Sequence, residues 1–285
     1  VGGRNLNNKY YPYATSPTKL TDIETLIKGQ TGADAQYYVE QLLASKYADD
    51  VRIKKIDSTH YLLLKNVIKQ NIDSIPYLYK NHQDTILMSV AAARFVHDDY
   101  SQWTRSKTVT NTVYQLITQA QKNLTIVSPY LIPPCKYLKA LKKASKKGVQ
   151  ISLISNSPQV SDAKIIAAAY MNDRRKYLKH HIKVLEYNGT KMLHDKLFLA
   201  DDSIAIIGSY NFDNISHHMN AEIIVEIKDT AFAHQIKKHI IKREEECFEV
   251  KHPKDKNPYN DKAIAKRTRW NQILLKLFPF IRRFL

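Results

Sequence analysis

The stretch that decides the fold reads MLHDKLFLADDSIAIIGSYNFDN and runs from Met192 to Asn214. Successive side chains of a β-strand point to opposite faces, so a strand here places His194 and Lys196 on one face and Asp195 on the other. An imidazole and an ammonium on one face suit an anion, above all a phosphate. The imidazole attacks phosphorus or delivers a proton, and the ammonium stabilises charge on the oxygens.

Further polar residues follow at fixed spacing. Asp201 falls just past the strand, at its turn, and Gly208 permits close backbone approach. We expect Ser209 and Asn211 to hydrogen bond phosphate oxygens or orient the imidazole, and Glu222 to accept a bond from a ring nitrogen and hold its tautomer. A single His-x-Lys is commonplace on protein surfaces. The combined spacing His-x-Lys-x4-Asp-x6-Gly-Ser-x-Asn is too constrained to be such an accident.

Composition sets the outer limits. The 285 residues are 44% hydrophobic and 25% charged, which is typical of a globular protein with one large or two ordinary domains. There are 44 Lys and Arg against 27 Asp and Glu, a formal net charge of +17. Such a balance attracts polyanions, either nucleic acid or an anionic membrane, and does not choose between them. A basic surface that serves solubility alone is the plainer alternative.

The cysteines, the histidine pairs and the longest apolar run argue against a disulfide framework, a metal site and a membrane-spanning segment. Cys135 and Cys247 form no disulfide framework and no zinc spacing, and are expected as small core residues. The adjacent pairs His180–His181 and His217–His218 are interpreted as surface or loop histidines, not as a metal site. The apolar run 86–96 is too short to span a bilayer.

The order of elements predicts an α/β fold. A strand is expected at 19–29 and a helix at 34–47. From residue 109 the pattern becomes regular, with helices at 109–120, around Leu138, Leu141 and Ala144, at 162–179 and at 230–246. Strands are expected at 124–134, 149–155, 182–187, 191–200, 203–207 and 221–227. Gly148 is expected to end the second of these helices. Strands alternating with helices favour a mixed sheet flanked by helices.

The segment HDKLFLADDSIAIIGSYN resembles the HKD signature of the phospholipase D superfamily. His194, Lys196 and Asp201 fall on its named positions, and Glu222 matches the acid downstream. The segments at 128–134 (SPYLIPP) and 146–154 (KKGVQISLI) are similar to the bacterial cardiolipin synthase branch. The opening residues VGGRNL resemble the end of a first HKD motif, with Asn5 as a phosphate ligand and Asp22 as a candidate for its downstream acid.

This resemblance implies a phospholipase D-like α/β sandwich whose N-terminal lobe is incomplete. The predicted divisions are a remnant of the first lobe at 1–60, a connecting segment at 61–108, the second lobe with the motif at 109–250, and a basic amphipathic tail at 251–285. The implied chemistry is phosphodiester exchange through a phosphohistidine, with no metal and no cofactor. It is either phosphatidyl transfer in the manner of cardiolipin synthase or the hydrolysis catalysed by phospholipase D.

The resemblance also assigns roles. The candidate catalytic residues are His194, Lys196, Asp201 and Glu222, with Asp201 given a structural role at its turn and Glu222 expected to orient His194. The candidate phosphate ligands are Ser209, Asn211 and Asn5. Members of the cardiolipin synthase branch usually carry Arg-Ser after Asn-Phe-Asp, whereas this chain has Ile215 ahead of Ser216. That difference bears on fine substrate preference.

The first His-x-Lys pair is expected upstream of Gly2. The chain is then a fragment, a disrupted gene product or a subunit completed by another chain. We favour the first two, which predict half an active site and little or no turnover by the isolated chain. A phospholipase D-family endonuclease and an inactive lipid-binding remnant are the alternative functions.

The C-terminal tail bears on the partner. Trp270, Ile273, Leu274, Leu277 and Phe278 recur at helical spacing among Lys and Arg residues. Such a helix either lies in an anionic membrane interface or packs on the protein's own core. The predicted partners are an anionic phospholipid of the phosphatidylglycerol or cardiolipin type and a membrane surface, with nucleic acid less favoured. The predicted location is a bacterial cell membrane, on either side.

Overall fold

The computed structural model describes residues 1–3, 20–46, 87–100, 107–259, 261–278, 280–281 and 285. The chain divides into two compact units, Val1–Gly32 with Val90–Leu285, and Ala33–Ser89. The described part of the smaller unit is mostly helix α1 (Gln30–Leu43), which confirms the helix predicted from residue 34 and begins earlier. The predicted divisions near residues 60, 108 and 250 remain predictions. The rest of the description concerns the larger unit.

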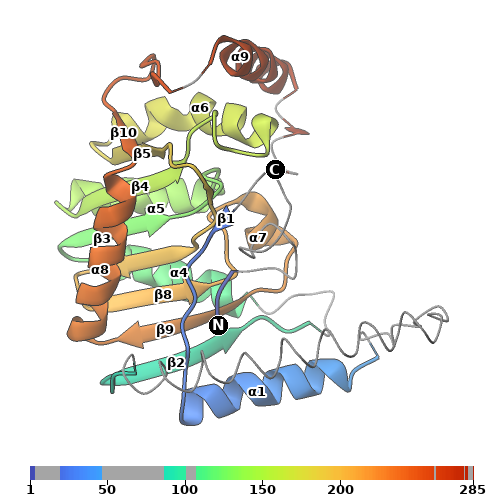
Figure 1. Ribbon diagram of the computed structural model, residues 1–285, viewed down its shortest axis with the longest axis vertical. Coiled ribbons are helices and arrows are strands. Elements are labelled where there is room, and N and C mark those ends of the chain that lie inside the picture. Colours follow the sequence, from blue (N-terminus) through green and yellow to red (C-terminus); the bar gives the residue numbers. More distant parts are fainter. Residues whose placement is uncertain (4–19, 47–86, 101–106, 260, 279, 282–284) are drawn as a thin grey trace. The chain divides into compact units, whose positions relative to one another are not determined.

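An eight-stranded mixed sheet forms the centre of the larger unit (Figure 1). Its spatial order is β10 (Cys247–Val250), β5 (Lys183–Tyr187), β4 (Gln150–Asn156), β3 (Asn123–Val127), β7 (Leu197–Ala200), β8 (Ile204–Gly208), β9 (Ile223–Lys228) and β2 (Ala92–His97). The pairs β3–β4 and β4–β5 are parallel, and the others are antiparallel. This arrangement confirms the predicted α/β class with a mixed sheet flanked by helices.

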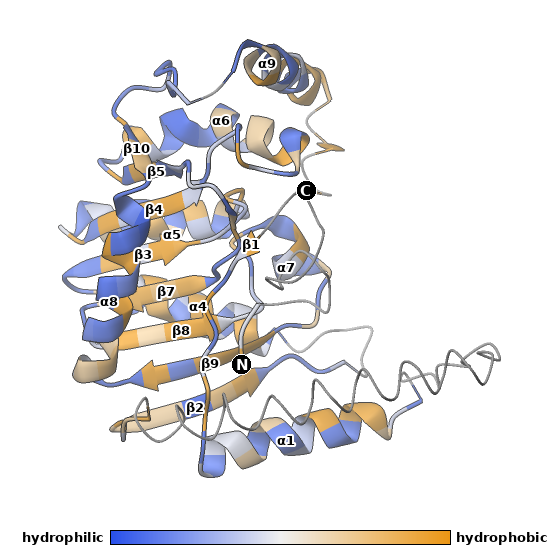
Figure 2. Ribbon diagram, in the orientation of Figure 1, coloured by the Kyte–Doolittle hydropathy of each residue, from blue (hydrophilic) through white to orange (hydrophobic). Residues whose placement is uncertain are grey.

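Helices cover both faces of the sheet. One face packs on α4 (Thr108–Gln119), α5 (Cys135–Lys146) and α6 (Lys164–Leu178), and the other packs on α8 (Thr230–Glu244). The period of two along β7 shows why: Phe198 belongs to the first core, whereas Leu197 and Leu199 belong to the second. Figure 2 shows the strands as hydrophobic and the outer side of α8 as largely hydrophilic.

Local signals set several element ends. Asp229 accepts a hydrogen bond from the backbone N–H of Phe232 at 2.8 Å and caps α8. Gly148 adopts φ +92 directly after α5, which confirms its predicted role in ending that helix.

The predicted strand at 191–200 is wrong in one respect. It is two strands in two sheets. β6 (Met192–Leu193) pairs in parallel with β1 (Leu20–Thr21), and β7 joins the large sheet. The segment His194–Lys196 therefore connects two sheets. The strand predicted at 19–29 is likewise reduced to β1 and a bridge between Gly2 and Glu24.

Three short elements were not predicted from the sequence. These are β2, β10 and helix α7 (Asn214–His218). Two predictions about burial are also wrong. Cys135 is exposed, because it begins α5 at the surface, and His217 is buried, because α7 turns it against the ring of Tyr137.

Helix α9 (Lys262–Leu277) packs on α6. Its buried residues are Thr268 and Leu275, so the helix does not use the predicted apolar stripe for this contact. Within the described residues, no helix combines the length and apolar character needed to cross a bilayer.

Candidate active site

Several strand ends meet at one edge of the large sheet. The start of β7 at Leu197 lies opposite Val127, the last residue of β3, and opposite Ile207 of β8. Gly208 at the end of β8 pairs with Ile224 near the start of β9. The segment His194–Lys196 enters β7 at this edge, and α7 follows β8 there. His194, Lys196, Ser209 and Asn211 of the spacing noted in the sequence thereby lie at the same edge of the sheet.

His194 is oriented by a carboxylate from a distant segment. Its Nδ1 lies 2.7 Å from Oδ2 of Asp22, next to β1, and its backbone N–H donates to the carbonyl oxygen of Thr21 at 2.7 Å. His194 is 8% exposed. A carboxylate that accepts the Nδ1 hydrogen leaves the lone pair on Nε2, which is the tautomer needed for attack through Nε2.

Lys196 lies against the same imidazole. Its Nζ is 2.7 Å from Nδ1 and 3.1 Å from Nε2 of His194, and it donates to the His194 carbonyl oxygen at 2.6 Å. Burial lowers the pKa of Lys196 to about 8, against the opposing effect of the Asp22 and Glu222 carboxylates. The ammonium thus lies against both ring nitrogens, closer to Nδ1 than to Nε2.

The opening glycines reach this site. A Cβ added to Gly3 would lie 2.5 Å from Cδ of Lys196, so the backbone of residue 3 is in close contact with the lysine side chain. The segment is held by a bridge between Gly2 and Glu24 and by hydrogen bonds between Val1 and Thr25. Asn5, the predicted phosphate ligand of this segment, lies outside the described residues.

The expectation that Glu222 orients His194 needs correction, because Asp22 occupies that position. The Glu222 carboxylate accepts hydrogen bonds from Ser209, from Ser216 at 2.6 Å and from Asn220 at 3.0 Å. Glu222 directly precedes β9 and lies just outside the strand on which it was predicted, and its carboxylate faces Ser216 of α7. Burial raises the pKa of Glu222 despite these three donors.

The two predicted phosphate ligands that the structure describes differ in their bonding. The Ser209 hydroxyl donates to Glu222 and accepts from the backbone N–H of Ile223 at 3.0 Å, so its hydrogen is already used. The backbone N–H of Asn211 donates to Ser216 at 3.0 Å. Among the described residues, the buried Oδ1 of Asn211 has no hydrogen-bond partner.

Asp201 lies at the other end of β7 from His194. It adopts φ +54, and its carboxylate accepts from the backbone N–H groups of Gln121, Lys122 and Asn123 at 2.7 to 3.2 Å. These contacts tie the β7–β8 turn to the start of β3. Such bonding fits the structural role expected for Asp201 and gives it no contact with the imidazole.

A cluster of polar side chains behind the site was not predicted from the sequence. Asp195 points away from His194 and is fully buried; it accepts from Arg243 Nε at 2.9 Å and lies 2.8 Å from Nε2 of His239, both on α8. Arg243 also donates to the Thr21 hydroxyl at 2.6 Å. The cluster joins α8, β1 and the His194–Lys196 segment, and so holds Asp22 where it meets His194.

Two further groups sit on α7. Asp213 caps this helix by accepting from the backbone N–H of Ser216 at 2.8 Å, and burial raises the pKa of Asp213 to about 7. Burial lowers the pKa of His217 to about 4, so this histidine is neutral near pH 7.

Comparison with known proteins places this site in a family. The family described as "Cardiolipin synthase, PLD-like domain" matches residues 113–243. The chain is 24% identical over 277 residues to cardiolipin synthase C of Escherichia coli, covering 85% of this chain and 58% of that protein. It is 33% identical over 176 residues to cardiolipin synthase B of Shigella flexneri, covering 60% of this chain and 39% of that protein. Among solved structures, phosphatidylserine synthase of Haemophilus influenzae matches 68% of this chain and 48% of its own with a TM-score of 0.53 at 15% identity, a likeness of fold.

Residues 113–243 therefore match a phospholipase D-like domain. This match and the cardiolipin synthases among its relatives agree with the resemblance noted in the sequence. It spans 58% or less of the length of these curated relatives.

Proposed function

We propose that this chain provides one half-site of an enzyme that exchanges phosphodiester bonds of anionic glycerophospholipids through a phosphohistidine. The observation that carries the proposal is the 2.7 Å contact between Asp22 and His194, with the Lys196 ammonium on the same ring. A carboxylate, an imidazole and a buried cation in this order supply the base, the nucleophile and the charge compensation that phosphoryl transfer needs. The similarity to cardiolipin synthases supports the lipid substrate.

The first step assigns His194 Nε2 as the nucleophile. Nε2 forms a bond to phosphorus while the bond from phosphorus to the leaving alcohol oxygen breaks, and that oxygen takes up a proton. Asp22 accepts the Nδ1 hydrogen throughout and stabilises the cationic ring of the intermediate. The roles can also be exchanged, with His194 as the general acid and a second histidine as the nucleophile. The contacts of His194 with Asp22 and Lys196 fit either role.

The phosphate needs cationic and polar partners. Lys196 Nζ, 3.1 Å from Nε2, would reach a non-bridging oxygen of a phosphate bound there. Asn211 and Asn5 keep their predicted role as phosphate ligands within this proposal. Ser209 reaches the phosphate only by giving up Glu222, so we assign it chiefly to holding that carboxylate.

The leaving alcohol requires a proton donor. His194 already serves as the nucleophile, and the described residues place no second histidine beside it. We assign this role to a first His-x-Lys pair ahead of Gly2, as the sequence resemblance implies, or to the same pair in a second chain. In the second step a water or an alcohol attacks phosphorus, releases His194 and passes its proton to that donor. Water gives hydrolysis, and the hydroxyl of a second phospholipid gives phosphatidyl transfer.

Trapping the intermediate tests the proposal. This chain and a version extended upstream through a first motif would each be mixed with phosphatidylglycerol vesicles or with single-stranded DNA, quenched in alkali and examined by mass spectrometry. We expect a phosphatidyl adduct on His194 with lipid, lost in His194→Ala. His252→Ala is the matched control, because His252 also precedes a lysine by two positions but lies on an exposed turn.

Each outcome decides between readings. An adduct and turnover only in the extended protein support a half-site that needs its partner motif. Turnover by the short chain that rises with its concentration supports completion by a second copy. Cleavage of DNA without any lipid adduct would overturn the lipid proposal in favour of an endonuclease, and absence of both adducts in either protein would leave an inactive remnant.

A further inference from the structure

The apolar stripe of α9 faces outward. Trp270, Ile273, Leu274 and Leu277 recur at i, i+3, i+4 and i+7, and they remain 66%, 44%, 40% and 69% exposed. The helix is attached to α6 by a different face, through buried Thr268 and Leu275 and through paired amides of Asn172 and Gln272. Large apolar side chains of this kind cost free energy when they face water, which indicates that something covers them.

The stripe is bordered by cations. Helix α9 contains five Lys or Arg residues and no Asp or Glu: Lys262, Lys266, Arg267, Arg269 and Lys276. At 100° per residue, Arg269 and Lys276 lie on one flank of the stripe and Arg267 on the other, while Lys266 falls within the stripe one turn before Trp270. An apolar face edged by cations is complementary to a layer with an apolar interior and anionic headgroups. A second protein surface offers both features less readily than a bilayer does.

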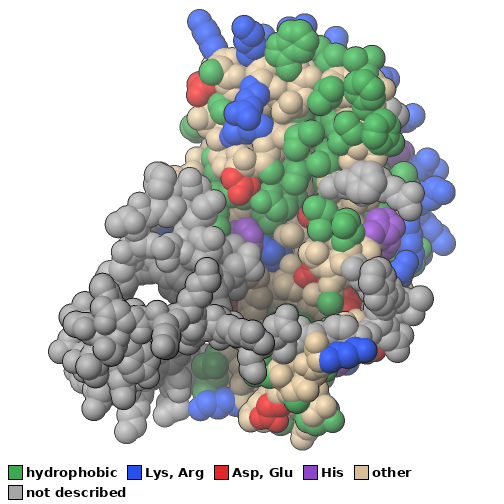
Figure 3. Space-filling model, turned by 90° about the vertical axis from the view of Figure 1, so that its right-hand side faces the viewer, with side chains coloured by type: hydrophobic (Ala, Val, Ile, Leu, Met, Phe, Trp, Pro, Cys, Tyr) green, Lys and Arg blue, Asp and Glu red, His purple; other side chains and the backbone are tan. Residues whose placement is uncertain are grey.

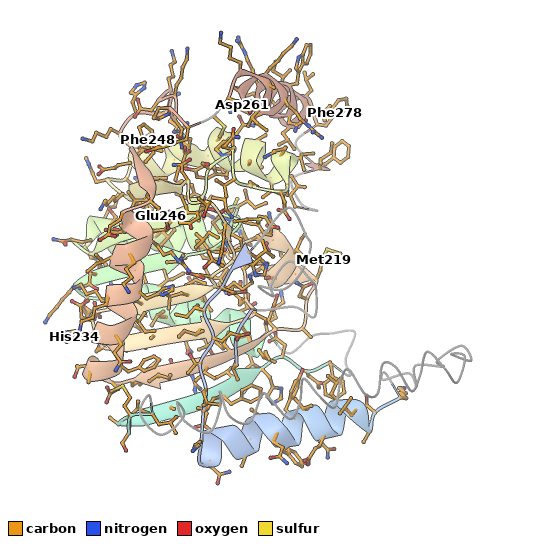
Figure 4. All side chains as sticks on the ribbon, in the orientation of Figure 1. Met219, His234, Glu246, Phe248, Asp261 and Phe278 are labelled. Carbon is orange, nitrogen blue, oxygen red and sulfur yellow. The ribbon has the colours of Figure 1, made fainter. Side chains whose placement is uncertain are left out.

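The same side of the molecule carries the site. A cavity of about 730 Å³ lies between α7 and α9 and is lined by Asn214 and His218 of α7 and by Leu275 of α9. Helix α7 also supplies Ser216 to Glu222 in the site. Figure 4 shows Met219, at the end of α7, and Phe278, at the end of α9, projecting on one side. Figure 3 views that side and shows hydrophobic side chains gathered in its upper part, where α9 lies, with Lys and Arg side chains around them.

We infer that the outward face of α9, continued by Met219 of α7, docks on an anionic phospholipid bilayer and turns the His194 edge of the sheet toward it. This inference rests on the proposed function for the meaning of that orientation, since the substrate would then be drawn from the surface on which the protein sits. Docking itself needs no turnover.

Vesicle binding by the full chain tests docking separately from chemistry. The chain has two tryptophans, so Trp103→Phe leaves Trp270 as the sole indole. We expect its emission to shift to shorter wavelength with vesicles of phosphatidylcholine and phosphatidylglycerol, and not with phosphatidylcholine alone. Replacing Trp270 and Leu277 by Ser should lower partitioning onto the mixed vesicles about tenfold or more. High salt should weaken it as well.

The matched control replaces two exposed apolar residues elsewhere, Leu26 (54% exposed) and Ile241 (49% exposed), by Ser. Circular dichroism shows whether each variant is folded, and these surface changes leave the core intact. Equal partitioning of the α9 variant and the wild-type chain would overturn the inference. So would a dimer in sedimentation analysis that the α9 substitutions dissolve without any change in vesicle binding, because a second copy would then cover the stripe. Docking without any lipid adduct would uphold this inference while the proposed function fails.

Discussion

Asp22 and His194 are separated by 172 positions, and their side chains meet at 2.7 Å. The contact depends on two short strands, because Thr21 pairs with Leu193 and its carbonyl oxygen accepts from the His194 backbone. The orientation of the imidazole is therefore set by Asp22, the residue that the sequence resemblance offers as the acid downstream of a first HKD motif.

Asp22→Asn should lower the reactivity of His194 with little effect on folding. Asparagine keeps the shape of the side chain but does not stabilise a cationic ring, so formation of the His194 adduct should slow by about 10²-fold or more. Nitrogen NMR of the histidine rings should show a changed tautomer at His194. Glu222→Gln is the contrasting variant. It should leave that signal unchanged, and a shift of the His194 signal by Glu222→Gln instead would contradict the assignment.

Lys196 predicts a pH dependence of anion binding. Its pKa of about 8 means that the ammonium is present below pH 8 and is lost above it. Binding of vanadate, measured by calorimetry, should weaken as the pH rises through about 8. Lys196→Met should bind poorly at every pH, whereas Lys191→Met, at an exposed position nearby, should behave as the wild-type chain. A flat profile for the wild-type chain between pH 7 and 9 would count against the lysine.

The same pKa predicts a change in the free energy of unfolding with pH. Because the folded-state pKa of Lys196 is lowered, the unfolded chain binds more protons between about pH 8 and the ordinary lysine pKa of 10.5. The contribution of Lys196 to stability therefore rises with pH across that window and is constant below it. Urea titrations of the wild-type chain and Lys196→Met should differ in slope there, and identical slopes would show that the lysine titrates normally.

Gly208→Ala should destabilise the fold strongly. The added Cβ would lie 2.2 Å from the Ile223 carbonyl oxygen and 2.6 Å from Ile224 Cα, and neither backbone atom can move without disturbing β9. We expect a loss of about 2–3 kcal/mol in the free energy of unfolding. Gly148→Ala meets nothing within 4 Å and suffers only from its φ of +92, so its loss should be about 1 kcal/mol. Reversal of that order in denaturant titrations would contradict the packing at β8.

Arg243→Met should weaken the cluster behind the site. It leaves the fully buried Asp195 carboxylate without its guanidinium partner, at a cost of about 2–3 kcal/mol. Adding Asp195→Asn to that variant should recover part of the loss, because the unpaired charge is gone. Lys242→Met, at the exposed position next to it, is the control. Additive losses for the two substitutions would show that the pair is not coupled.

Asp201→Ala should affect stability and not chemistry. It deprives three backbone N–H groups of their acceptor, at a cost of about 1–2 kcal/mol. The His194 adduct should form at an unchanged rate at temperatures where the variant is folded. A slowed adduct with unchanged stability would give Asp201 a role in the reaction after all.

The regular part of the fold could be predicted because its signals are local. The strands from β3 to β9 are runs of apolar residues, and the helices between them show a period of 3.6. Strand β2 escaped prediction because most of its residues are exposed or half-buried and carry Arg94 and His97. Strand β10 is only four residues long and half polar. The identity of His194 and Lys196 as a pair followed from spacing alone.

The partner of His194 could not be predicted from the motif, because β1–β6 pairing joins segments far apart in the sequence. A signal was present in hindsight. Gly2 bridges Glu24 two residues after Asp22, and Gly208 pairs with Ile224 two residues after Glu222. Each acid thus lies two residues before the partner of a glycine that precedes polar residues of the site. The cluster of Asp195 with His239 and Arg243 has no such signal, because nothing in α8 distinguishes those residues from other polar positions on a helix.

The pairing of β1 with β6 has a consequence for assembly. It contains only two residue pairs, Leu20 with Met192 and Thr21 with Leu193. A slip of one residue would turn Asp22 to the opposite side of its strand and bring Thr21 or Ile23 toward the ring. The imidazole therefore has its carboxylate partner only when the opening segment has docked in the correct register. If β6 and β7 form before the opening segment docks, His194 and Lys196 are already in place while the carboxylate partner of the ring is still missing, so the contact that completes the site is the last one to form.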